Sequence, residues 1–76
     1  MGGMMTSEDM AALSQATGTE FDSMWLQMMI AHHEGAVVMA EQVKETTTNP
    51  EVEKLADEVI RTQTKEIQMM QAYLAP

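Results

Sequence analysis

The chain has 76 residues, with twelve Asp and Glu against four Lys and Arg, so its formal net charge is −8. This charge makes DNA, RNA and anionic membrane surfaces poor partners, because polyanions are repelled while cations are concentrated near the surface. No cysteine is present, which excludes disulfides, thiolate zinc sites and cysteine nucleophiles. The length suits a single domain, residues 1–76, and a core of this size commonly needs a metal ion or a partner subunit.

The N-terminal part of the chain predicts a short helix behind an irregular lead. Residues 1–6 are rich in Gly and Met, and we expect them to be mobile. A helix over residues 8–16 follows, with Ser7 as its cap and two acidic residues in its first turn. Gly18 is placed to end this helix.

Two long helices are predicted in the rest of the chain. Residues 20–46 are dominated by Met, Leu, Gln, Ala and Glu and contain no proline, which favours one continuous helix. Thr19 is its predicted N-cap, with Asp22 three residues later in the reciprocal capping position. After a threonine-rich break, Asn49 caps a third helix over residues 50–74, whose first residue is a proline.

These elements predict an all-α fold, with a short N-terminal helix and a long antiparallel helical hairpin. Two helices alone make a poor core, whereas two paired hairpins form a four-helix bundle that buries both apolar faces. We therefore expect a homodimer, or docking with a partner helical hairpin. No run of about 18 apolar residues occurs, so we expect no membrane span. The first residues also lack the basic start and apolar run of a signal segment.

The long helix over residues 20–46 carries an apolar stripe with a histidine in its middle. At about 100° per residue, six side chains fall on one line: Phe21, Trp25, Met28, His32, Met39 and Val43. His33 is turned to the edge of this stripe. Met28 and His32 are i, i+4 neighbours, and so are Met29 and His33, which allows each pair to converge on one ion.

Methionine is unusually abundant, at ten residues against three aromatic ones, although ordinary cores are built from Leu, Ile, Val and Phe. Imidazole and thioether ligands together suit Cu(I) and Ag(I), and suit Cu(II) where imidazole dominates. The pattern therefore predicts a copper site, with Cu(I) favoured over Cu(II). The candidate ligands are His32, His33, Met28, Met29, Met39, Met70 and Glu66. A second, weaker site is conceivable at Met1, Met4, Met5 and Met10.

A structural interpretation of the same residues stays open. A single histidine on an apolar face is more often a core residue than a ligand. Methionines at helical spacing commonly fill gaps in a core, and Met-rich faces also bind partner proteins.

The third helix places two polar side chains, Gln63 and Glu66, inside its apolar stripe. A buried Glu is unfavourable unless it is paired or bound to a cation, so His32 or His33 is the expected partner of Glu66. This carboxylate either binds metal directly, orients a ligand histidine through its second ring nitrogen, or joins a hydrogen-bond network without metal. Met70 should face inward, and the methionine before it should face outward.

No catalytic motif is present. The Glu-x-x-His pair of di-iron bundles and the His-Glu-x-x-His pattern of zinc proteases are both absent. The serines lie in or near helix starts and suggest no nucleophile triad, and no phosphate-binding glycine loop occurs. We therefore expect a protein that is not an enzyme.

Two parts of the chain resemble the bacterial family called domain of unknown function 305, and the likeness covers about residues 4 to 74. The matching elements are the run from Phe21 to Ala40 with His32-His33-Glu34-Gly35 at its centre, the helix entry Asn49-Pro50, and Gln63-x-x-Glu66-Ile67-x-x-Met70. The His-His-Glu-Gly element is long and rare, which makes the resemblance specific. Residue by residue, the family motif matches His32, His33, Met28, Met29, Met39, Gln63, Glu66 and Met70.

The resemblance implies a ferritin-like four-helix arrangement in secreted, periplasmic or lipid-anchored proteins that often hold two such hairpins. This chain looks like the second hairpin only. The resemblance also implies copper or silver binding and tolerance, since some members are implicated in both.

The expected function is that of a soft-metal binding protein, for copper first and silver second, that buffers the metal or confers tolerance to it. His32 and Met28 are the expected core ligands. We expect an extracytoplasmic location, and the absence of cysteine fits an oxidising compartment. The alternative is a non-catalytic interaction or structural module whose Met-rich face binds a helix within a larger assembly.

Overall fold

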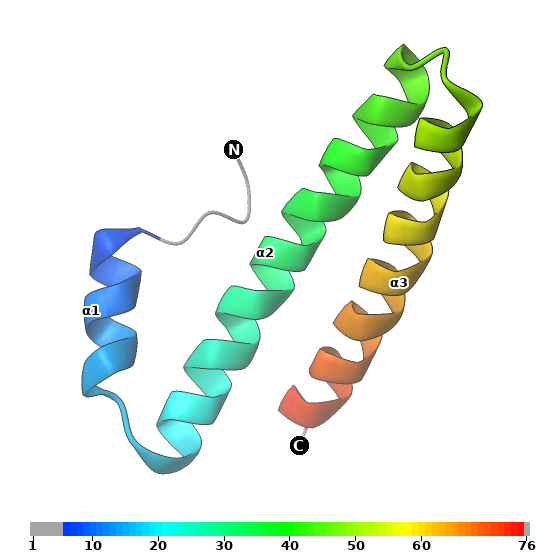
Figure 1. The fold of residues 1–76 in the computed structure, drawn as a ribbon. Helices are drawn as coiled ribbons and strands as arrows, with labels where there is room; N and C mark the ends of the chain where they lie inside the picture. The colour runs from blue at the N-terminus through cyan, green and yellow to red at the C-terminus, as the bar shows by residue number, and fades with distance from the viewer. Residues whose placement is uncertain (1–5, 76) are drawn as a thin grey trace.

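The computed structural model describes residues 6–75, which form three α-helices and no strand. α1 covers Ser7–Gln15, α2 covers Gly18–Thr46 and α3 covers Pro50–Leu74. The predicted all-α class, with one short helix followed by a long hairpin, is confirmed (Figure 1). Among the described residues, none of the helices is long and apolar enough to cross a membrane.

α1 begins one residue before the predicted start, because Thr6 rather than Ser7 is its cap. The Thr6 hydroxyl oxygen accepts a hydrogen bond from the Asp9 amide at 3.0 Å, and the Asp9 carboxylate accepts one from the Thr6 amide at 3.1 Å. This reciprocal arrangement is a capping box. Thr6 is therefore the N-cap of α1 rather than part of the expected lead, and residues 1–5 of that lead lie outside the described residues.

α2 also begins earlier than predicted, at Gly18 rather than after Thr19. Its N-cap is Thr17, whose side chain makes no capping hydrogen bond, so the predicted cap was wrong. Gly18 has a φ of +59°, a left-handed conformation that glycine adopts without steric cost. The glycine thus makes the turn between α1 and α2 and does not simply end the first helix.

α3 begins where the sequence predicts. The side-chain oxygen of Asn49 accepts hydrogen bonds from the amides of Glu51 and Val52 at 2.9 and 3.4 Å. Pro50 occupies the first helical position, where its missing N–H is not needed. The short connection sends α3 back along α2, as the antiparallel pair in Figure 1 shows.

The hairpin has a thin core. α2 and α3 pack along one another, and α1 contacts only α2 among the described residues. The most buried apolar side chains are Ala40 and Ala56, which are 6% and 5% exposed, and Met70 at 8%. Met69 is 52% exposed, so the prediction that only the second of these adjacent methionines faces inward is confirmed. No side chain in the described part of the chain is fully buried.

α3 does not cover the middle of the apolar stripe of α2. Trp25 and Met39, both on the stripe, remain 42% and 48% exposed. α3 packs instead against the side of α2 that contains His33 and Ala40. This side is turned by about 100° around the helix axis from the direction of His32. As a result His33 is buried and His32 is exposed, which reverses the order of burial expected from the stripe.

Candidate metal centre

His33 is held at both of its ring nitrogens. Nδ1 lies 2.7 Å from the main-chain oxygen of Met29, one turn earlier on α2, and Nε2 lies 2.8 Å from Oε2 of Glu66 on α3. The His33 side chain is 9% exposed and that of Glu66 is 46% exposed. The Nε2–Oε2 bond connects a buried side chain of α2 to a partly exposed side chain of α3. It confirms the prediction that Glu66 pairs with one of the two histidines.

The protons shared among His33, Glu66 and the Met29 carbonyl oxygen determine whether His33 can bind a metal ion. The Met29 carbonyl can only accept, so Nδ1–H donates to it. One further proton lies between Nε2 and the Glu66 carboxylate, carried either by the ring or by the carboxyl group. In both cases both ring nitrogens are engaged in hydrogen bonds, so a metal ion would have to displace a proton and break one of these bonds to bind His33. The structure shows Glu66 hydrogen-bonded to a histidine, His33.

Met28 and His32 occupy a different side of α2. They are one turn apart on the apolar stripe that α3 leaves uncovered, with Met28 half-buried and His32 exposed. Side chains with this spacing lie one above the other, so the thioether and the imidazole can reach a common point. Met39 is on the same stripe but seven residues beyond His32, a rise of about 10.5 Å, so it is the more distant of the two methionines.

The remaining predicted ligands lie elsewhere. Met70 is 8% exposed and belongs to the contact between α2 and α3. Met29 is half-buried, and its main-chain oxygen accepts the bond from His33. Met10 is exposed on α1, and the other three N-terminal methionines of the suggested second site fall outside the described residues. The seven predicted ligands are therefore not gathered around one point.

The chemistry of the available donors restricts the metal. Within residues 6–75 no three His, Asp or Glu side chains are grouped so that they can hold an ion. Zinc, magnesium and calcium sites rely on such nitrogen and oxygen clusters. On the uncovered stripe of α2, the thioether of Met28 and the imidazole of His32 lie one turn apart, and this pair of donors fits a soft ion such as Cu(I).

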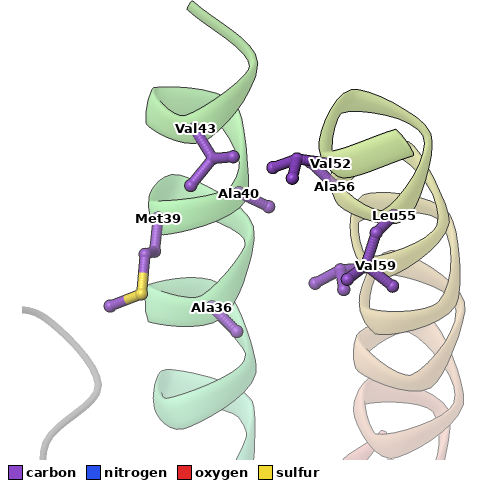
Figure 2. A pocket seen from close by; sticks show the side chains of 8 residues that line it. All are labelled: Ala36, Met39, Ala40, Val43, Val52, Leu55, Ala56 and Val59. Carbon is purple, nitrogen blue, oxygen red and sulfur yellow. The ribbon is translucent and has the colours of Figure 1, made fainter. Parts of the chain in front are cut away.

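The sequence reasoning did not find an apolar groove that the two helices form together. The groove has a volume of about 320 Å³ and is lined by Ala36, Met39, Ala40, Val43, Val52, Leu55, Ala56 and Val59. Figure 2 shows these side chains on the two facing helices, with Met39 directed away from α3. Ala40 and Ala56 are the most buried side chains of the lining, so the helices approach closely at these two residues and the groove lies beside this contact.

Comparison with known protein families matches residues 1–74 to the domain described as domain of unknown function, DUF305. The matched range includes the hairpin together with α1 and the His32-His33 pair. No curated protein and no solved structure matches the chain.

Proposed function

The chain belongs to the DUF305 family of domains of unknown function, and we propose that it binds a soft metal ion, copper first, without catalysing a reaction. His32 and Met28 are the ligands at the centre of this proposal. His33, Glu66, Met29 and Met70 support the site by fixing the position of α2 against α3 and are not direct ligands.

One observation carries the proposal. The two adjacent histidines are separated in role, because His33 is engaged on both ring nitrogens by Met29 and Glu66. His32 lies on the exposed side of α2, and Met28 is one turn away on the same helix. The hydrogen bond from His33 to Glu66 of α3 limits rotation of α2 about its axis, and therefore helps to keep the His32 imidazole and the Met28 thioether on the face of α2 that α3 leaves uncovered.

Copper suits this face better than other common metals. Thioether sulfur is a soft ligand that binds Cu(I) and Ag(I) well and binds magnesium or calcium poorly. The net charge of −8 also favours accumulation of cations near the protein. Buffering of copper, or tolerance to it, needs only binding and release. We place the protein outside the cytoplasm, in line with the absence of cysteine.

The test is an anaerobic titration of the protein with Cu(I) in competition with a chelator of known affinity. We expect stoichiometric binding tighter than micromolar, and we expect His32→Ala and Met28→Leu each to weaken it by more than about tenfold, or about 1.4 kcal/mol. Met69→Leu is the matched control, because Met69 is an exposed methionine of α3 outside the proposed ligand pair. If His32→Ala and Met28→Leu both bind Cu(I) with the affinity of the parent, the proposed site is wrong.

A second candidate function rests on the apolar groove. Its lining residues include Leu55, which is 64% exposed, and such an apolar surface commonly marks an interaction site. Under this alternative the chain is an interaction or structural module, and the face closes a four-helix bundle with another hairpin. The His32→Ala variant separates the two functions, because it should abolish copper binding by a metal-binding protein and should leave partner binding by an interaction module intact.

A further inference from the structure

We propose that the open face of the hairpin binds a second copy of this chain in an antiparallel, two-fold arrangement, with the aromatic end of each copy seated in the apolar groove of the other. The open face is defined by the stripe of α2, Phe21 to Val43, together with the groove residues of α3. The two His32 side chains then lie opposite each other at the two-fold axis.

The chain exposes more surface than a compact monomer of its mass, by about the area that a second copy would bury. The chain exposes 5739 Å², whereas a compact monomer of 8.5 kDa exposes about 4,700 Å². The excess is about 1,000 Å², and a stable interface buries about 800 Å² on each partner. Together with the absence of any fully buried side chain in the described part of the chain, this indicates a core that association would complete.

The positions of the contacting features select a second copy as the occupant. His32 is the central residue of α2, whose 29 residues run from Gly18 to Thr46 and leave 14 on each side of it. Trp25 lies seven residues before His32, and Met39 in the groove lies seven residues after it. Both are therefore about 10.5 Å from His32 along the helix. A two-fold rotation at the level of His32 places each Trp25 over the partner's groove.

The two ends of the face are complementary in shape. At the open end of the hairpin, Trp25 of α2 and Tyr73 of α3 border a shallow hollow and are 42% and 75% exposed. At the closed end, the groove is lined by aliphatic, alanine and methionine side chains alone. Burial of exposed aromatic side chains in such a groove is the kind of contact that dominates the energy of protein interfaces.

The arrangement also completes the metal site, a consequence that rests on the function proposed above. Each copy supplies one imidazole and one thioether, from His32 and Met28. Two copies related at His32 supply two of each, a four-ligand set of the soft and borderline kind that suits copper. The expected stoichiometry is therefore one copper ion per dimer.

The interface is tested on the metal-free protein by sedimentation equilibrium from low to high micromolar concentration, with the emission of Trp25 followed in parallel. Trp25 is the sole tryptophan, so its emission reports on this face. Leu55→Glu places a charge in the groove, and Val38→Glu is the matched control. Leu55 and Val38 are 64% and 56% exposed, but Val38 is turned about 100° from Met39, away from the groove.

We expect a dimer for the parent and for Val38→Glu, and a monomer with red-shifted Trp25 emission for Leu55→Glu. Met39→Glu, which changes the α2 side of the groove, should behave as Leu55→Glu does, and circular dichroism establishes that each variant is helical. A parent chain that stays monomeric at every concentration overturns the proposal. So does a dimer that survives both groove substitutions.

Copper titration then separates this inference from the proposed function. A dimer that forms without metal but binds no copper retains the interface and rejects the metal site. One copper ion bound per monomeric chain rejects the interface and leaves the metal-binding function in place. One ion per dimer, lost in Leu55→Glu, supports both.

Discussion

His33 of α2 and Glu66 of α3 meet in a hydrogen bond of 2.8 Å between Nε2 and Oε2, and this contact joins the middle of α2 to the C-terminal half of α3. Because Nδ1 of the same ring is bound to the Met29 carbonyl oxygen, the imidazole is fixed in orientation. Two histidines that are adjacent in the chain therefore have different roles, since one links the helices and the other lies on the open face.

Removal of the carboxylate should weaken the hairpin. In Glu66→Ala the buried His33 ring loses a partner, and we expect the free energy of unfolding to fall by about 1–2 kcal/mol, less than for a fully buried pair because water reaches this site. Glu66→Gln retains an acceptor oxygen and should lose less. Urea unfolding followed by circular dichroism measures both, and equal losses in the two variants would show that the hydrogen bond is not the stabilising feature.

The two histidines should differ in their effect on stability. His33→Ala deletes a buried ring and leaves the Met29 carbonyl and Glu66 without it, so we expect a loss of about 2 kcal/mol or more. His32→Ala removes an exposed ring and leaves no buried cavity, so we expect a smaller loss of unfolding free energy than in His33→Ala. A His32→Ala variant as unstable as His33→Ala would contradict the observed order of burial.

The close helix contact depends on alanine. Ala40 is 6% exposed and packs against α3, so Ala40→Leu should overfill the contact and cost about 1–3 kcal/mol. Ala31→Leu is the control, because Ala31 is exposed on the same helix. Thermal unfolding compares the stability of the two variants. If Ala40→Leu is as stable as Ala31→Leu, the helices can move apart at this contact without a loss of stability.

The turn between α1 and α2 depends on glycine. Gly18 has a φ of +59°, and a Cβ built there meets no atom within 4 Å, so only backbone strain opposes substitution. Gly18→Ala should therefore destabilise by about 1–2 kcal/mol. Thr17→Ala is the control, because the Thr17 side chain makes no capping hydrogen bond. We expect this substitution to lower the free energy of unfolding only slightly. Equal effects of the two substitutions would place the strain elsewhere.

An ion pair near the closed end of the hairpin predicts a pH effect. The hydrogen bond that the Lys44 ammonium group donates to the Asp57 carboxylate, and then the negative charge of Asp57, raise the pKa of Lys44 above its usual value of 10.5. The stabilisation is therefore complete below pH 10.5 and is lost as the pH rises through the higher folded-state value. The difference in unfolding free energy between the parent and Lys44→Gln should shrink over this alkaline range. A difference that stays constant with pH would show that the charge of Lys44 is not involved.

The helices, and the residues that begin α3, follow from the sequence alone. Asn49 before Pro50 is a local signal, because cap and proline act on backbone groups within a few residues. The inward position of Met70 follows from helical periodicity in the same way. The start of α2 was misjudged because the sequence contains two threonines, Thr17 and Thr19, and the backbone conformation of Gly18 between them decides which one precedes the helix.

The tertiary structure decided which side of α2 meets α3. The apolar stripe of α2 is centred on His32, and its pattern alone predicts that His32 is the inward histidine. The small side chains of Ala40 and Ala56 allow the helices to approach along the edge of this stripe, which buries His33 instead and leaves the groove beside it. Periodicity shows which residues share a face, but packing between two helices depends on side-chain volume at the contact. The pairing of His33 with Glu66, and the exposure of Met28 and His32 together, follow from that contact.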